Sequence, residues 1–206
     1  MHRRTRQPFQ LRPHDPEGVW ESNDGRYRTY AHLILEEHKE LCKRVLLQWP
    51  KEATAPITDP HKYPEITELA RRRDQTSDTT RIYAAMAVEG YLNFYGVLRL
   101  GQQAFDDHFE RLGLVPKLRA LLLVCDQLDV PTSDELVQHL DRVAQSRNSL
   151  VHPKTREVQG DLSAHKRTGN PMPETAEKAV SSMEEFFESF IKAVPKAANH
   201  LNRAYA

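Results

Sequence analysis

The 206-residue sequence predicts an all-α fold, a helical bundle preceded by an extended N-terminal arm. Glycine is scarce at eight residues, and only 8% of the residues are aromatic. Long segments rich in Leu, Ala, Glu and Arg carry apolar residues at helical spacing, and no stretch shows the period-2 alternation and turn signals of a β-hairpin. We expect residues 1–25 to form the arm and residues 26–206 to form one domain, because this length allows a single sizeable core.

Three helices are predicted in the first half of the domain. Apolar residues lie roughly on one stripe from Tyr27 to Trp49, and two prolines end this helix. A short helix is expected within residues 59–74, after a loop. A long helix follows over residues 76–100, with Ser77 or Asp78 as its N-cap. Because this long helix is apolar nearly all round, we expect it at the centre of the bundle.

Four further helical segments are predicted in the second half of the domain. Residues 103–112 form a short helix that Gly113 stops, and residues 114–128 form the next, with a proline in its first turn. The helix over residues 131–152 begins with a capping box of Thr132 and Glu135. A charged loop over residues 153–173 leads to the closing helix, over residues 173–201, which we expect to bend at Pro195.

Charge and cysteine content narrow the classes of function. The 29 basic and 29 acidic residues give a formal net charge of zero, so nucleic acid or an anionic membrane would need a local basic patch. Two cysteines, Cys42 and Cys125, lie far apart in sequence and favour free core thiols over a disulfide or a zinc–thiolate site. The N-terminus lacks the apolar run of a secretory signal, and polar residues interrupt the most apolar stretch. We therefore expect a cytoplasmic protein with no membrane contact.

The helix over residues 131–152 carries a charged residue on its apolar side. Leu136, Leu140, Val143, Arg147 and Leu150 follow a four–three–four–three spacing, which is that of a packing seam. A lone arginine on a seam is unfavourable unless its charge is paired. Asn148 and His152 share a neighbouring face, and Pro153 indicates that His152 ends the helix, where the helix dipole favours the imidazolium form.

These side chains are the groups that cleavage of a phosphodiester requires. The guanidinium of Arg147 can hold charge on the non-bridging oxygens, and His152 can move a proton at the attacking or leaving oxygen. With RNA the 2′-hydroxyl of the substrate can attack, so the reaction requires no metal ion or cofactor. The alternative is that both residues are purely structural: the Arg147 side chain extends along the apolar surface to place its charge in solvent, and His152 caps the helix.

The segment "RNSLVH" resembles the motif of the HEPN superfamily, in which an arginine and a polar residue precede a histidine. The segment "VEGYLN" resembles an earlier helix of that family, with Glu89 four residues before Asn93. The resemblance extends over about residues 75–195. It assigns Arg147 and His152 as the catalytic pair and Asn148 as their polar neighbour.

The resemblance implies a helical-bundle domain that acts as a metal-independent endoribonuclease. It further implies a toxin or defence effector whose composite active site forms at a homodimer interface, with RNA as substrate and an antitoxin or another protein as regulator. The family also includes catalytically silent modules, which leaves binding of RNA, a nucleotide or a protein partner as the alternative.

Further expectations concern the surroundings of this site. Glu89 and Asn93 are polar residues on an apolar stripe, so we expect Glu89 to pair with Arg147 and Asn93 to support the pair, with Arg119 as the rival partner of Glu89. We also expect a dimer interface that buries part of the apolar seam. Phosphate contacts are expected in the loop after His152, at Lys154, Arg156, Lys166 and Arg167. The basic residues Arg71, Arg72 and Arg73, like Arg3, Arg4, Arg6 and Arg12 of the arm, fit either a phosphate contact or a solvated surface.

Overall fold

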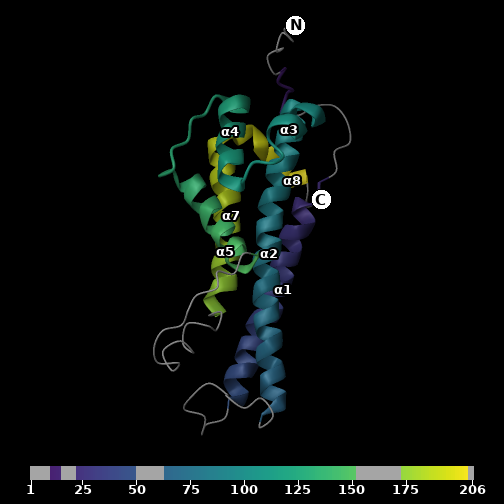
Figure 1. Cartoon of the computed structure of the whole chain (residues 1–206), viewed down its shortest axis with the longest axis vertical. Coiled ribbons are helices and arrows are strands. Elements are labelled where there is room, and N and C mark those ends of the chain that lie inside the picture. The colour runs from purple at the N-terminus through teal and green to yellow at the C-terminus, as the bar shows by residue number, and fades with distance from the viewer. Residues whose placement is uncertain (1–9, 15–21, 50–62, 152–172, 204–206) are drawn as a thin grey trace, which may run out of the picture.

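The computed structural model describes residues 10–14, 22–49, 63–151 and 173–203, and within these ranges the fold is all-α, as predicted, with no strand. Four long helices form the body: α1 (Asp24–Gln48), α2 (Pro64–Leu100), α5 (Glu135–Val151) and α7 (Pro173–Ala193). Shorter helices α3 (Gln102–His108), α4 (Leu114–Asp126) and α8 (Ala198–Arg203) lie toward one end of the bundle (Figure 1).

Helix α2 is the central helix, as its apolar composition predicted. It packs against α1 on one side and against α5 and α7 on the other, and α1 and α2 extend together beyond the remaining helices (Figure 1). A small separate cluster of Leu41, Val45 and Leu69 holds this extension together. None of the described helices is long and apolar enough to cross a membrane.

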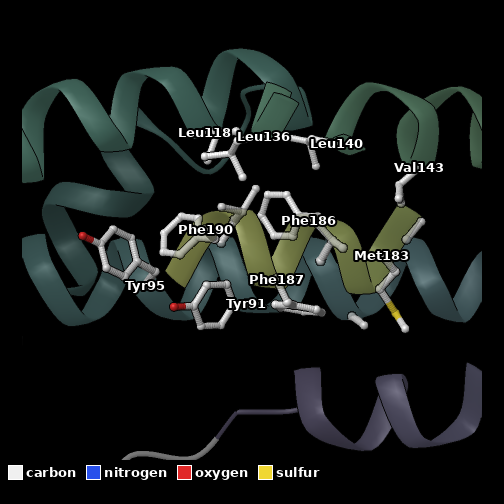
Figure 2. Close-up of a cluster of buried hydrophobic side chains, with 14 of the residues drawn as sticks. Tyr91, Tyr95, Leu118, Leu136, Leu140, Val143, Met183, Phe186, Phe187 and Phe190 are labelled. Atoms are coloured by element: carbon white, nitrogen blue, oxygen red, sulfur yellow. The ribbon is translucent and has the colours of Figure 1, made fainter. Parts of the chain in front are cut away.

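The main core is built around the aromatic side chains of α7. Phe187 and Phe190 pack edge-on against Tyr91 of α2, with ring centroids 5.5 and 5.2 Å apart. Figure 2 shows Phe186 on the other side of α7, facing leucine side chains that come from α4 and α5. Edge-to-face aromatic contacts of this kind add to the stabilisation from burial alone. The core therefore fixes α5 relative to α2 through α7.

The predicted division between a short helix over residues 59–74 and a long one over residues 76–100 is wrong. Helix α2 is continuous over 37 residues. The polar stretch in its middle contains no glycine or proline, and the hydroxyls of Thr79 and Thr80 donate to the carbonyls four residues earlier, at 2.8 and 2.9 Å. Such bonds let hydroxyl side chains remain inside a helix. Ser77 is accordingly a buried interior residue of α2 and not a cap.

Two predicted helix ends are also corrected. Gly113 precedes α4 as its N-cap residue, and its carbonyl accepts from the amide of Lys117 at 2.9 Å, whereas α3 ends earlier. At the start of α5, the amide of Leu136 donates to the side chain of Asp134 at 2.9 Å, so Asp134 takes the capping position expected for Thr132. The closing helix was expected to bend at Pro195; the interruption is there, but as a break, since α7 ends at Ala193 and a short 3-10 turn, Pro195–Ala197, separates it from α8.

The described part of the arm, residues 10–14, lies against the end of α2. The amide of Arg12 donates to the carbonyl of Arg99 at 2.8 Å, and Nε2 of His14 lies 3.2 Å from Oδ1 of Asp126. Gly101 has a φ of 83°, and a Cβ there would lie 2.8 Å from the guanidinium of Arg12. A glycine at this turn thus permits both the backbone conformation and the close approach of the arm.

Candidate functional site

The motif residues lie at the last turns of α5. Arg147 is half-buried and Asn148 is exposed, and the helix ends at Val151. His152 and the expected phosphate contacts Lys154, Arg156, Lys166 and Arg167 lie outside the described residues, as do Arg3, Arg4 and Arg6.

Arg147 makes no hydrogen bond or ion pair to any described residue. Other guanidinium groups near the core are held in place. Arg99, for example, donates to the carbonyl of Cys125 at 2.6 Å, and Arg28 binds the carboxylate of Glu184. The N–H groups of Arg147 therefore donate to none of the described residues. Arg147 lies on the same stripe of α5 as the buried Val143, one turn earlier.

The seam that leads to Arg147 is buried within the chain. Leu136, Leu140 and Val143 are at most 2% exposed. Figure 2 shows these three side chains pointing toward Phe186 and the other core residues of α7. The expectation that a second copy buries them is wrong, because α7 already provides the complementary apolar surface.

The expected pairing of Glu89 with Arg147 is also wrong. The residue that meets this stripe of α2 is Lys117 of α4, which is 1% exposed. Its Nζ donates to Oδ1 of Asn93 at 2.7 Å. Burial lowers the pKa of Lys117, and the nearby carboxylate of Glu89 acts in the opposite direction. The rival candidate, Arg119, donates instead to the carbonyl of Val130 at 2.9 Å.

The buried guanidinium that does meet α5 belongs to Arg81 of α2, which the sequence analysis missed. Arg81 is 7% exposed. Its Nε donates to Oγ of Ser146 at 3.0 Å, and its Nη2 donates to the carbonyl of Ser146 and to Oγ of Ser149, both at 2.6 Å. Nη1 lies 3.3 Å from Asp78, the one carboxylate within reach among the described residues. Arg81 thereby fastens the last two turns of α5 to α2.

A helical wheel of α2 contains the signal for Arg81. Residues 77, 81, 84 and 88 follow a four–three–four spacing, and all four are buried. The residues just before Arg81 are polar, so its place on the apolar stripe is visible only when the wheel is continued back to Ser77. Burial lowers the pKa of Arg81, and Asp78 acts against this change.

A cleft lies between α5 and α7 beside this contact, with a volume of about 610 Å³. Its lining combines basic, hydroxyl and amide side chains with one carboxylate. The lining residues are Arg81, Arg142, Gln145, Ser146, Ser149, Thr175, Lys178, Ala179, Ser181, Ser182 and Glu185. Arg147 and Asn148 are not among them, so the motif and the cleft belong to different faces of α5.

The basic stretch of α2 is paired with acidic residues. Arg71 binds Glu68 at 2.6 Å, Arg72 lies 3.2 Å from Glu37, and Arg73 lies 2.7 Å from Asp74. These pairs favour the interpretation of a solvated helix surface over that of a phosphate contact. Both cysteines are free, and burial raises the pKa of the Cys125 thiol to about 12, which suits a core residue.

A second concentration of polar groups surrounds Asp126 near the end of α2. Asp126 accepts a hydrogen bond from the hydroxyl of Tyr95, and its Oδ1 lies 3.2 Å from Nε2 of His14. Burial lowers the pKa of His14, and the cation of Arg99 acts in the same direction. Together these contacts hold the described arm residues to the bundle. In the described ranges no three His, Cys, Asp or Glu side chains form a group suited to a metal ion.

No family model matches the chain, and neither does any curated protein or any solved structure.

Proposed function

We propose that the chain is a metal-independent endoribonuclease of the HEPN type, acting as a toxin or defence effector. The observation that supports this proposal is the unpaired guanidinium of Arg147, half-buried near the end of α5 beside the exposed amide of Asn148. A cation that forms no internal contact at such a position is available to an anionic ligand. The sequence places His152 directly after the end of the helix.

The proposed reaction requires three groups on the protein and one on the substrate. Arg147 binds the non-bridging oxygens of the scissile phosphate, and Asn148 donates a hydrogen bond to the same group. The 2′-hydroxyl of RNA attacks phosphorus while the bond to the 5′-oxygen breaks, which leaves a 2′,3′-cyclic phosphate and a free 5′-hydroxyl. His152 moves the proton between the attacking and leaving oxygens.

The proposed active site is composite and forms where two copies of α5 meet. The interface cannot use Leu136 or Leu140, which are already buried, and must use the face that Arg147 presents. Val151, 48% exposed, lies about 40° from Arg147 on the helix and would be part of that interface. RNA, a second copy of the chain and an antitoxin or other regulatory protein are the partners in this proposal.

A specific observation favours the alternative, a catalytically silent module that binds RNA, a nucleotide or a protein. Glu89 and Asn93 lie with Lys117, so these two residues do not orient Arg147. Catalysis depends on such orientation more strongly than binding does. The two functions differ in whether RNA is cut.

The test is incubation of the purified protein with total RNA in the presence of a chelator. The variants are Arg147→Ala and His152→Ala, and the control is Arg44→Ala, which removes an exposed arginine of α1. We expect cleavage by the wild type and the control, and a loss of at least roughly a hundredfold in each motif variant.

Two results would count against the ribonuclease. Cleavage that persists in Arg147→Ala would show that the motif does not carry the activity. Absence of cleavage, with RNA bound by the wild type and more weakly by Arg147→Ala, would favour the silent binding module.

A further inference from the structure

The described part of the N-terminal arm, residues 10–14, is held to the bundle largely through His14. Nε2 of His14 lies 3.2 Å from Oδ1 of Asp126, the last residue of α4. Its ring is stacked with that of His200 of α8, with centroids 6.4 Å apart, and its carbonyl accepts a hydrogen bond from Nε2 of His200. The ring of Tyr95 of α2 lies 6.1 Å away. His14 therefore lies where three helices meet.

The two ring nitrogens of His14 have different surroundings. Nε2 faces the carboxylate of Asp126, so the single proton of the neutral ring is best placed on this nitrogen. Nδ1 is buried and has no hydrogen-bond partner among the described residues. Protonation of the ring would add an N–H group at Nδ1, and a buried N–H group without an acceptor is unfavourable. The docked position therefore accommodates the neutral ring better than the imidazolium.

The charges that face His14 act in the same direction. Asp126 is the carboxylate beside the ring, and it is shared with Arg99 of α2, whose Nη2 lies 3.9 Å from Oδ1. Lys196, in the 3-10 turn before α8, is a further cation, and His200 adds another when it is protonated. Burial lowers the pKa of His14, the charge of Arg99 lowers it further, and the charge of Asp126 acts against this change.

We propose that residues 10–14 form a proton-released strap, held against the bundle while His14 is neutral and detached when His14 takes up a proton. After release, the ring lies in solvent and has the ordinary histidine pKa of about 6.5, whereas the docked ring takes up its proton only at lower pH. The released state is therefore increasingly populated as the pH falls below about 6.5, by at most about tenfold per pH unit for one proton. This proposal does not depend on the ribonuclease proposal, since none of these residues belongs to the motif.

The test is amide hydrogen exchange of the full chain, followed by NMR. The reporter is the amide of Arg12, which donates to the carbonyl of Arg99 at 2.8 Å while the strap is docked. Its protection factor, corrected for the intrinsic pH dependence of exchange, is measured between about pH 5 and pH 8. Circular dichroism at each pH follows the helices. The variants are His14→Gln, which keeps an N–H group toward Asp126 but takes up no proton, and His200→Gln.

The matched control is His32→Gln, a half-exposed histidine of α1. We expect the protection factor of the wild type and of the control to fall below about pH 6.5, by up to roughly tenfold per pH unit, while the helical signal is unchanged. His14→Gln should remove this pH dependence, and His200→Gln should retain it. The ring signals of His14 in the wild type give a readout that needs no variant, with an expected titration midpoint below about pH 6.5.

The proposal is overturned if the protection of the Arg12 amide does not fall in acid, or if it falls equally in His14→Gln. It is also overturned if protection and the helical signal are lost together, because acid would then unfold the bundle and not release the strap. A titration midpoint of His14 above about pH 6.5 would contradict the proposal directly, whatever the behaviour of the variants. Loss of the pH dependence in His200→Gln, with its retention in His14→Gln, would assign the proton to His200 and overturn the role of His14.

Discussion

Two faces of the last turns of α5 present a guanidinium group in opposite ways. On the cleft face, Arg81 reaches across from α2 and makes four hydrogen bonds, three of them to Ser146 and Ser149. On the motif face, Arg147 projects from α5 itself and bonds to none of the described residues. The first arginine is nearly fully buried and the second is half-buried.

The comparison shows that hydrogen bonding separates a structural arginine from an available one. Both residues lie on apolar stripes, so helical position alone does not tell them apart. Arg81 can be buried because neutral oxygens of α5 replace the water it loses. Arg147 keeps contact with solvent and has given up none of its donors to the fold.

Arg81→Ala should lower the free energy of unfolding by roughly 3–4 kcal/mol, since it removes several charge-assisted hydrogen bonds and leaves Ser146 and Ser149 without their donor. Chemical denaturation followed by circular dichroism measures this change. Arg142→Ala, an exposed arginine of α5, is the control and should change stability by less than about 0.5 kcal/mol. Equal effects in the two variants would show that Arg81 is not an anchor.

Asn93→Ala tests a second buried cation, the ammonium of Lys117, by removing the side chain to which it donates. Loss of the 2.7 Å hydrogen bond should lower the free energy of unfolding by roughly 2 kcal/mol at pH 7. Burial places the pKa of Lys117 below its ordinary value, so the folded protein loses this proton before the unfolded chain does. The bond to Asn93 favours the protonated form, and the penalty of the variant should therefore shrink as the pH rises toward about 10.5.

Denaturation of the wild type and Asn93→Ala between pH 7 and pH 10.5 measures this trend, because other titrating groups cancel in the difference. A penalty that grows with pH would contradict the assignment. Cleavage activity adds a second readout. If Asn93 supported Arg147, as the sequence suggested, Asn93→Ala would reduce cleavage under conditions where the protein remains folded.

The fold could be predicted from the sequence to the extent that its signals are local. Helical spacing and proline positions indicated most helices and the break at Pro195, because both act within one or two turns. The continuity of α2 was not predicted because the stretch in its middle is polar, and a polar stretch is typical of a loop. The hydroxyls of Thr79 and Thr80 bond back to the helix backbone there, and this is not evident from the sequence.

The candidate site could be predicted only in part, for a different reason. A helical wheel shows that Glu89 and Asn93 share a stripe, but it does not show which helix faces that stripe. The neighbour is α4, which brings Lys117, while α5 meets α2 through Arg81. Which helix faces a given stripe depends on how the helices are arranged in space. The periodicity of a single sequence does not determine this arrangement.

Asp134→Ala tests how the other end of α5 is fixed. The side chain of Asp134 accepts from the amide of Leu136 at 2.9 Å, so its loss should lower the free energy of unfolding by about 1 kcal/mol. Thr132→Ala is the matched control and should have almost no effect, since Thr132 lies outside the helix. Thermal unfolding of both variants measures the difference. If Thr132→Ala lowered the stability more than Asp134→Ala does, the capping box of Thr132 and Glu135 that the sequence suggested would be the correct assignment.

Arg147→Ala should change the free energy of unfolding by less than about 0.5 kcal/mol, although Arg147 lies on the seam. Alanine and arginine are both good helix formers, so the helix itself loses little. No bonded partner among the described residues is left unsatisfied, and the lost contact is that of a half-buried aliphatic stem. Chemical denaturation beside Arg81→Ala measures the contrast directly. If Arg147→Ala were as destabilising as Arg81→Ala, its guanidinium would be a second structural anchor, and the availability on which the ribonuclease proposal rests would be lost. A small effect on stability with a large effect on cleavage is the combination expected of a residue that the fold leaves free for its substrate.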